Sequence, residues 1–107
     1  MEVRFSTDPV GFKSMTTESL RKAFLIDSLF QQGAVPMVYS DIDRSITGSA
    51  VPVSIDLQLL SSKKEMAADY FLERREIGII NIGAVGTIIA EGKEFPMQSK
   101  DALYIGR

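Results

Sequence analysis

Four consecutive charged residues are the side chains best placed to do chemistry. Glu73, Arg74, Arg75 and Glu76 directly precede a run rich in Ile and Gly. A planar guanidinium binds a carboxylate through two parallel hydrogen bonds, so Arg74 and Arg75 are candidate ligands for an acidic substrate. The commoner alternative is a solvated or ion-paired turn between two strands. A contact between subunits is a third possibility.

A second polar cluster runs from Tyr39 to Arg44. Its carboxylates, Asp41 and Asp43, are two residues apart, so on a strand they would share one face and could hold a hard cation or perform acid–base work. More often such a stretch is a turn in which an Asp–Arg pair fixes the backbone. Arg44 is the third candidate for binding an acidic substrate.

The composition removes several classes of chemistry. The chain has no His and no Cys. It therefore lacks a Ser–His relay, a thiolate nucleophile, and nitrogen or sulfur ligands for zinc, iron or copper. We expect no catalytic residue and no metal ligand among these 107 residues, and any chemistry would depend on carboxylates, Lys, Arg or Tyr.

Charge and hydropathy exclude two classes of partner. The net charge is −2 without a basic stripe, so neither nucleic acid nor an anionic membrane is an expected partner. The start of the chain lacks the pattern of a signal peptide, and the near-apolar stretch 77–90 is too short and too often broken by Gly to span a bilayer. We expect a soluble, cytoplasmic protein.

The pattern in the first half predicts one helix and one strand. A helix is expected from Thr16 to Ala23, because Thr hydroxyls can cap its first turn. The stretch FLIDSLF, residues 24–30, fits either a continued helix or a buried strand. Strict alternation from Val51 to Leu59 predicts a half-buried strand, with Pro52 favouring a strand end or a sheet edge.

The second half predicts short strands joined by tight turns. Residues 63–68 favour one helical turn, although propensity alone would permit a helix as far as Glu76. The expected strands are 77–82, 87–90, 94–97 and 101–105, with a hairpin at Glu91-Gly92-Lys93. Such spacing indicates one domain, residues 1–107, built as an antiparallel sandwich or barrel rather than a βαβ fold.

One spacing resembles part of a known motif. Glu76 is followed after six residues by Gly83, as in the second half of the first cupin motif, G(X)5HXH(X)3-4E(X)6G. With a three-residue spacer the two histidines of that motif fall on Tyr70 and Leu72; with four they fall on Asp69 and Phe71. The ending Asp-Ala-Leu-Tyr-Ile-Gly, residues 101–106, is similar to the start of the second cupin motif. The resemblance implies a cupin-like, jelly-roll lobe without its metal ligands.

The Gly-x-x-Gly at 83–86 does not indicate a phosphate site. It lacks the Gly-x4-Gly-Lys-Ser/Thr spacing of a P-loop and opens a strand rather than a helix. A tight turn is expected there.

Longer stretches resemble one enzyme family. The segments LRKAFLI, MVYSDIDRSITG, YFLERREIGIINIG, GTI and DALYIG occur in the order found in the amino-terminal portion of 5-keto-4-deoxyuronate isomerase. The resemblance implies a two-lobed, longer cytoplasmic enzyme of pectin and hexuronate breakdown that forms homo-oligomers, expected to be hexamers. It also implies zinc bound in the other half of the protein, with no ligand carried by this chain. This piece alone is then expected to be inactive. The alternatives are a cupin-like module that binds an acidic sugar and a purely structural oligomerisation domain.

Overall fold

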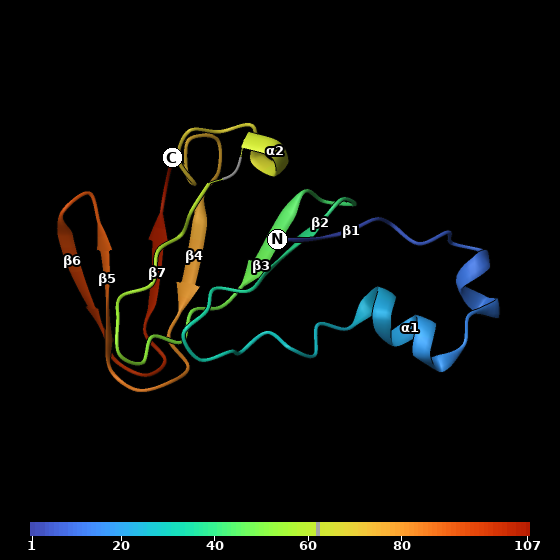
Figure 1. Cartoon of the computed structure of the whole chain (residues 1–107), viewed down its shortest axis with the longest axis horizontal. Helices are drawn as coiled ribbons and strands as arrows, with labels where there is room; N and C mark the ends of the chain where they lie inside the picture. Colours follow the sequence, from blue (N-terminus) through green and yellow to red (C-terminus); the bar gives the residue numbers. More distant parts are fainter. Residues whose placement is uncertain (62) are drawn as a thin grey trace. The chain divides into compact units, whose positions relative to one another are not determined.

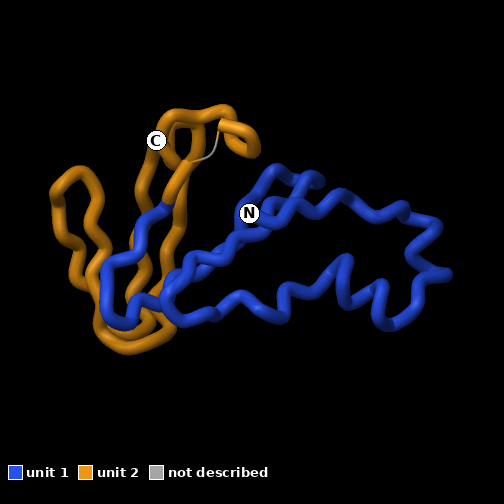
Figure 2. Tube along the Cα trace, viewed as in Figure 1, with its two compact units in different colours: residues 1–59 blue, residues 60–107 orange. Residues whose placement is uncertain are grey.

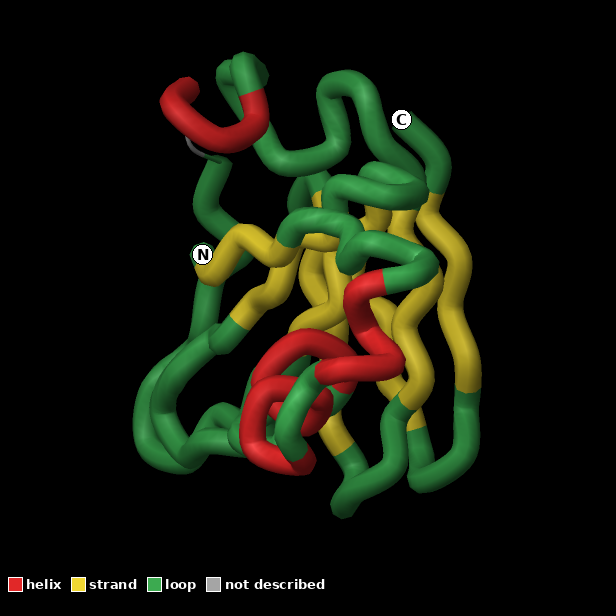
Figure 3. Tube along the Cα trace, turned by 90° about the vertical axis from the view of Figure 1, so that its right-hand side faces the viewer, coloured by secondary structure: helices red, strands yellow, loops and turns green. Residues whose placement is uncertain are grey.

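The computed structural model describes residues 1–61 and 63–107. The chain divides into two compact units, Met1–Leu59 and Leu60–Arg107 (Figure 2), and each is considered by itself. Short strands predominate over helices in the described residues, and loops and turns join them along much of the chain (Figure 3). The expectation of a mainly β protein is confirmed at this level. The described strands form three small sheets, and none of these sheets closes into a barrel.

The first unit is built on a three-stranded sheet. Its strands are β1 (Glu2–Arg4), β2 (Met37–Ser40) and β3 (Ser45–Gly48), in the order β1-β2-β3 (Figure 1). β2 and β3 form an antiparallel hairpin, but β1 pairs with β2 in parallel. A purely antiparallel arrangement was therefore the wrong expectation. The parallel pair is possible because residues 5–36, which include η1 (Gly11–Ser14) and α1 (Thr17–Phe24), form a crossover long enough to join parallel strands.

The helix α1 confirms the prediction made from its capping residues. Thr16 is the N-cap, and its Oγ1 accepts a hydrogen bond from the Ser19 backbone N–H at 3.2 Å. Glu18 in the first turn complements the positive end of the helix. The helix ends at Phe24. Residues 25–31 belong to neither a helix nor a strand, so both options considered for the stretch after it were wrong.

The predicted strand from Val51 to Leu59 does not form. Only Val51 makes a β-bridge, with Gln32. Three of the five side chains expected to face a core are exposed, with Val53 67%, Ile55 71% and Leu59 41% accessible. Alternation favours a strand only when a neighbouring strand and a packing surface are available. None of the described residues supplies a ladder partner for residues 52–59, and Pro52 lacks a donor.

The second unit contains one helical turn and two antiparallel strand pairs. The turn α2 (Lys63–Met66) is confirmed, and the competing helix through Glu76 is absent. The strands are β4 (Ile77–Ile80), β5 (Gly86–Ala90), β6 (Lys93–Met97) and β7 (Ala102–Ile105). β5 pairs with β6, and β4 pairs with β7, so the inner hairpin is nested within the outer pair.

The inner hairpin turns through two residues with positive φ. Glu91 has φ 50° and Gly92 has φ 75°, between the paired residues Ala90 and Lys93. Positive φ at both central positions defines a type I′ turn, whose twist matches that of the flanking strands. The predicted hairpin is therefore confirmed, together with the strands on either side of it.

Asn81 links the outer strand pair to the inner hairpin. Its backbone N–H donates to the Asp101 carbonyl at 2.9 Å, and its own carbonyl accepts from the Lys100 N–H at 2.6 Å. Its side-chain Nδ2 donates to the carbonyls of Ala84 (2.8 Å) and Met97 (3.0 Å), while Oδ1 accepts from the Gly83 N–H at 3.0 Å. The tight turn predicted at residues 83–86 is thus held by a single amide.

Few of the described side chains are buried. Val38 in the first unit and Met66, Ala68 and Met97 in the second are between 4% and 9% exposed. Each strand pair of the second unit instead has one half-buried apolar face and one exposed face. In the described part of the chain no helix reaches the length and apolarity needed to cross a lipid bilayer.

Asn81→Asp tests the amide that joins the two strand pairs. A carboxylate keeps the acceptor for Gly83 but loses both donors and faces two carbonyl oxygens. We expect the free energy of unfolding to fall by about 1–3 kcal/mol, measured by chemical denaturation. Gln58→Glu, the same chemical change at an exposed position, is the control. Equal stability of the two variants would contradict the role given to Asn81.

Candidate functional site

The charged stretch from Glu73 to Glu76 forms a corner before β4. The Glu73 N–H donates to the Tyr70 carbonyl at 3.2 Å, and Glu73 Oε2 accepts from the Asp69 N–H at 2.7 Å. This carboxylate therefore fixes the backbone of the corner. The interpretation as a turn is confirmed, but the corner follows α2 rather than a strand, so its description as a strand-to-strand turn was wrong.

The two arginines of this corner differ in exposure. Arg74 is exposed and Arg75 is half-buried. Arg74 lines a shallow pocket of about 240 Å³ together with Lys63, Ala67, Ala68, Asp69 and Glu73. In that pocket Lys63 Nζ lies 3.2 Å from Asp69 Oδ1, with both side chains mostly in solvent. The pocket is smaller than the roughly 300 Å³ at which small-molecule sites begin, and it carries charges of both signs.

Glu76, the acidic residue of the cupin-like spacing, contacts a tyrosine on the neighbouring strand. Gly78 pairs with Tyr104, so Glu76, two residues earlier, lies on the same face of the β4–β7 pair. The Tyr104 hydroxyl donates a hydrogen bond to the Glu76 carboxylate, and this bond raises the pKa of Tyr104 above its usual value of 10.0. The side chain is 66% exposed, which makes the pair a surface contact rather than part of an enclosed site.

The positions that hold histidines in the cupin motif lie near this corner. Asp69, Tyr70, Phe71 and Leu72 fall in the turn between α2 and β4, not on a strand. Tyr70 is 62% exposed, and Asp69 pairs with Lys63. The described residues contain no group of three or more His, Cys, Asp or Glu side chains that could hold a metal ion.

The second polar cluster is the turn between β2 and β3. The Asp43 carboxylate accepts hydrogen bonds from the Ser45 hydroxyl at 2.8 Å and from the Ser45 N–H at 3.2 Å. These bonds hold the pKa of Asp43 below its usual value of 3.8. Arg44 adopts φ 55°, a left-handed conformation typical of turns. The predicted turn is confirmed, with Ser45 as the partner that fixes Asp43.

The structure places the three predicted arginines in different surroundings. Arg74 and Arg75 are neighbours in the second unit, while Arg44 lies in the first. Their assignment to an acidic substrate stays a prediction.

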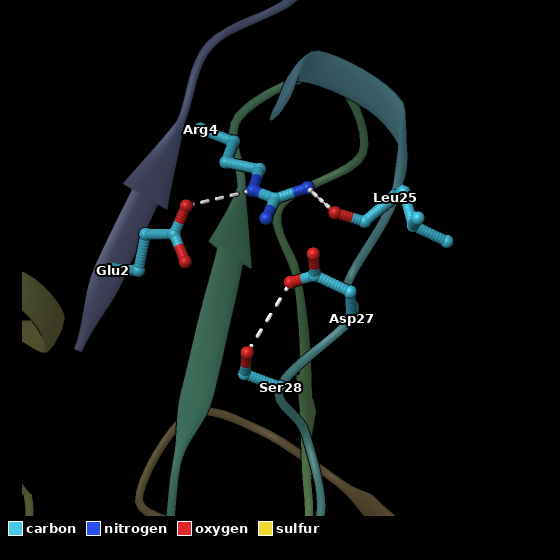
Figure 4. Close-up of polar contacts among 5 residues, drawn as sticks. All are labelled: Glu2, Arg4, Leu25, Asp27 and Ser28. Carbon is cyan, nitrogen blue, oxygen red and sulfur yellow. Dashed lines mark hydrogen bonds and ion pairs between the residues drawn. The ribbon is translucent and has the colours of Figure 1, made fainter. Parts of the chain in front are cut away.

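An arginine that was not among the predicted site residues makes a side-chain contact with a residue 21 positions away. Arg4 Nε donates to Glu2 Oε1 at 2.8 Å on the same strand, and Nη1 donates to the Leu25 carbonyl at 2.6 Å just after α1 (Figure 4). The Arg4 side chain is only 18% exposed. The contact ties β1 to the crossover. The residues around Arg4 in the sequence do not indicate that its side chain bonds to the carbonyl of Leu25, 21 residues away.

Arg4 also lines a pocket of about 850 Å³ in the first unit. The charged side chains around this pocket are three acidic and three basic, namely Glu2, Glu18, Asp27, Arg4, Arg21 and Lys22. The acidic and basic side chains balance, and the Arg4 guanidinium is already bonded to Glu2 and Leu25. The pocket therefore favours no ligand class.

Comparison with known proteins gives matches along the whole chain. The 4-deoxy-L-threo-5-hexosulose-uronate ketol-isomerase of Caldicellulosiruptor bescii is 53% identical over 106 residues, which are 99% of this chain and 38% of that protein. Proteins of the same name from Lachnoclostridium phytofermentans (51% over 106 residues, 99% of this chain and 38% of the relative) and Opitutus terrae (48% over 107 residues, 100% and 39%) match similarly. No family model matches the chain.

These comparisons confirm the resemblance inferred from the sequence. The relatives are named as isomerases, and the chain spans less than two fifths of their length.

Glu76→Gln tests the contact between the corner and β7. The amide removes the charged acceptor, so the pKa of Tyr104 should fall toward 10.0. Because the native pKa is raised, the stabilisation from this pair is present below pH 10 and is lost as the pH rises through the raised value. NMR titration of the tyrosine ring carbons measures the shift. Glu73→Gln, which alters the neighbouring Asp69 contact, should leave Tyr104 unchanged; equal shifts would count against the assignment.

Proposed function

We propose that this chain is a structural lobe of a ketol-isomerase that converts 4-deoxy-L-threo-5-hexosulose uronate, also called 5-keto-4-deoxyuronate, to 3-deoxy-D-glycero-2,5-hexodiulosonate. One observation carries this proposal: curated proteins with that printed name are 43–53% identical to the chain along nearly all of its length. Placement in pectin breakdown, in the cytoplasm, follows from the same likeness and belongs to the proposal.

The nested strand pairs support a cupin-like, jelly-roll lobe. In a jelly roll a long antiparallel hairpin folds over, so that the inner and outer strand pairs belong to two different sheets. β5–β6 lies within β4–β7, and the two pairs are in separate sheets. Glu76 stands at the entry to β4, where the cupin spacing places its carboxylate. We propose that the described strands belong to such a lobe.

The residues present do not fit the zinc site that the family resemblance implies for the parent enzyme. The chain has neither imidazole nor thiolate. The carboxylates nearest the motif positions are already engaged: Asp69 with Lys63, Glu73 with a backbone N–H, and Glu76 with Tyr104. These residues therefore do not supply the ligands of a zinc site.

The reaction itself explains why a lobe of this kind would need the rest of the enzyme. An aldose–ketose shift moves a proton between neighbouring carbons through an enediol, which requires a base and a group that stabilises the developing oxyanion. Glu73 and Glu76, the carboxylates of the charged corner, are instead bonded to a backbone N–H and to Tyr104. The role that remains is packing and contacts between subunits of a homo-oligomer, which we propose to be a hexamer.

Activity measurements test this division of roles. The tag-free 107-residue chain should neither isomerise the uronate nor carry stoichiometric zinc, whereas a chimaera of the Caldicellulosiruptor bescii enzyme, with this chain in place of its matching 106 residues, should be active. Turnover is followed by NMR of the sugar, and metal content by elemental analysis. Activity or zinc in the isolated chain would overturn the assignment, as would an inactive chimaera that is folded.

A binding module for an acidic sugar is the second candidate function. It is favoured by one observation, the exposed Arg74 beside Lys63 in the pocket of the second unit. The small size of that pocket and its two acidic residues argue for the structural role instead.

Calorimetric titration of the isolated chain with galacturonate separates the two functions. We expect no heat of binding at millimolar ligand. Saturable binding that Arg74→Ala abolishes and Arg21→Ala preserves would instead establish the binding module, because Arg21 lies in the other unit.

A further inference from the structure

The outer edge of β5 is an unprotected ladder edge. In a two-residue hairpin the residues that flank the turn form the first hydrogen-bonded pair, here Ala90 and Lys93. Hydrogen-bonded and non-hydrogen-bonded pairs then alternate along the antiparallel ladder. The pairs Ile89–Glu94 and Thr87–Pro96 are therefore non-hydrogen-bonded, and their backbone groups point away from the partner strand.

Pro96 fits this hydrogen-bonding pattern, and it protects only the outer edge of β6. Proline has no N–H, so it fits a ladder where that group would point outward, which is the position derived for Pro96. On the outer edge of β6 it removes a donor, and Lys93 and Glu94 add charge beside it. Proline and charged residues are the usual means of keeping other strands off an edge. β5 carries none of them between Gly86 and Ala90.

The groups at the outer edge of β5 have no partner strand among the described residues. β5 belongs to a two-stranded sheet and pairs only with β6. Thr87 is exposed, and Ile89 is 59% exposed. Two strands alone are marginally stable in water, and a third strand or a packed partner is usually required.

We propose that the outer edge of β5, at Thr87 and Ile89, receives a β-strand from the part of the longer ketol-isomerase chain that lies outside these 107 residues. This inference rests on the proposed function, because the relatives that the chain matches have more than half of their length outside the matched region. A strand on the same polypeptide is favoured over a second copy of the chain, since covalent attachment raises its effective concentration. Main-chain hydrogen bonds to Thr87 and Ile89 give the affinity, and Ile89 supplies an apolar contact.

Amide hydrogen exchange tests the proposal at one residue pair. Ile89 and Glu94 face each other, and their N–H groups point to opposite edges. In the isolated chain both should exchange quickly. In the folded chimaera with the Caldicellulosiruptor bescii enzyme, exchange at Ile89 should slow by at least about tenfold while Glu94 stays fast.

Three results would overturn the inference. They are fast exchange at Ile89 in the folded chimaera, equal protection of Ile89 and Glu94, and protection of Ile89 in the isolated chain that grows with its concentration. The last result would assign the edge to a second copy. Isomerase activity is measured on the same sample. An inactive chimaera in which Ile89 is protected counts against the proposed function alone. An active chimaera in which Ile89 is unprotected counts against the proposed strand pairing at β5 alone.

Proline variants of the chimaera give a second readout. Thr87→Pro deletes an outward N–H from β5, and Glu94→Pro deletes one from the edge that Pro96 already protects. The unfolding midpoint should fall by several degrees for Thr87→Pro and by clearly less for Glu94→Pro; equal shifts contradict the proposal.

If the unsubstituted chimaera is insoluble, the isotope-labelled chain is titrated with the separately produced remainder of that enzyme. Resonance shifts at Ile89 but not at Glu94 support the proposal, and their absence overturns it.

Discussion

The arrangement of the second unit depends on the side-chain amide of Asn81. This amide bonds at once to the turn at residues 83–86 and to the end of β6, while the backbone of Asn81 bonds to Lys100 and Asp101, just before β7. An amide suits this position because it offers two donors and an acceptor on a short, nearly rigid side chain. The nesting of one strand pair inside the other is thereby fixed at a single point.

This constraint accounts for the character of the charged corner. With β4 held at Asn81 and paired to β7, the preceding residues leave the sheet as a turn, and their carboxylates bond to the nearest N–H and hydroxyl groups. In this charged stretch Glu73 therefore fixes the local backbone and Glu76 bonds to Tyr104.

Local signals predicted the parts of the fold whose cause is local. The Thr16 cap, the Glu91-Gly92 turn and the β-branched runs each specify structure within a few residues, and the structure contains them. The strand expected at residues 51–59 failed because alternation describes one surface and carries no information about a partner. The parallel pairing of β1 and the reach of Arg4 to Leu25 were equally inaccessible, since the first joins strands separated by the whole crossover and the second joins residues 21 positions apart. For the candidate site, residue types excluded nitrogen and sulfur ligands, but only coordinates could show which carboxylates were engaged.

Nesting also has a consequence for the order in which the chain gains structure. The entropic cost of closing a loop grows with the number of residues it contains. Once the Glu91-Gly92 turn has brought β5 and β6 together, those strands behave as a single short link between β4 and β7. The inner hairpin thus lowers the entropic barrier to the outer pairing, and a contact that is distant in sequence becomes effectively local.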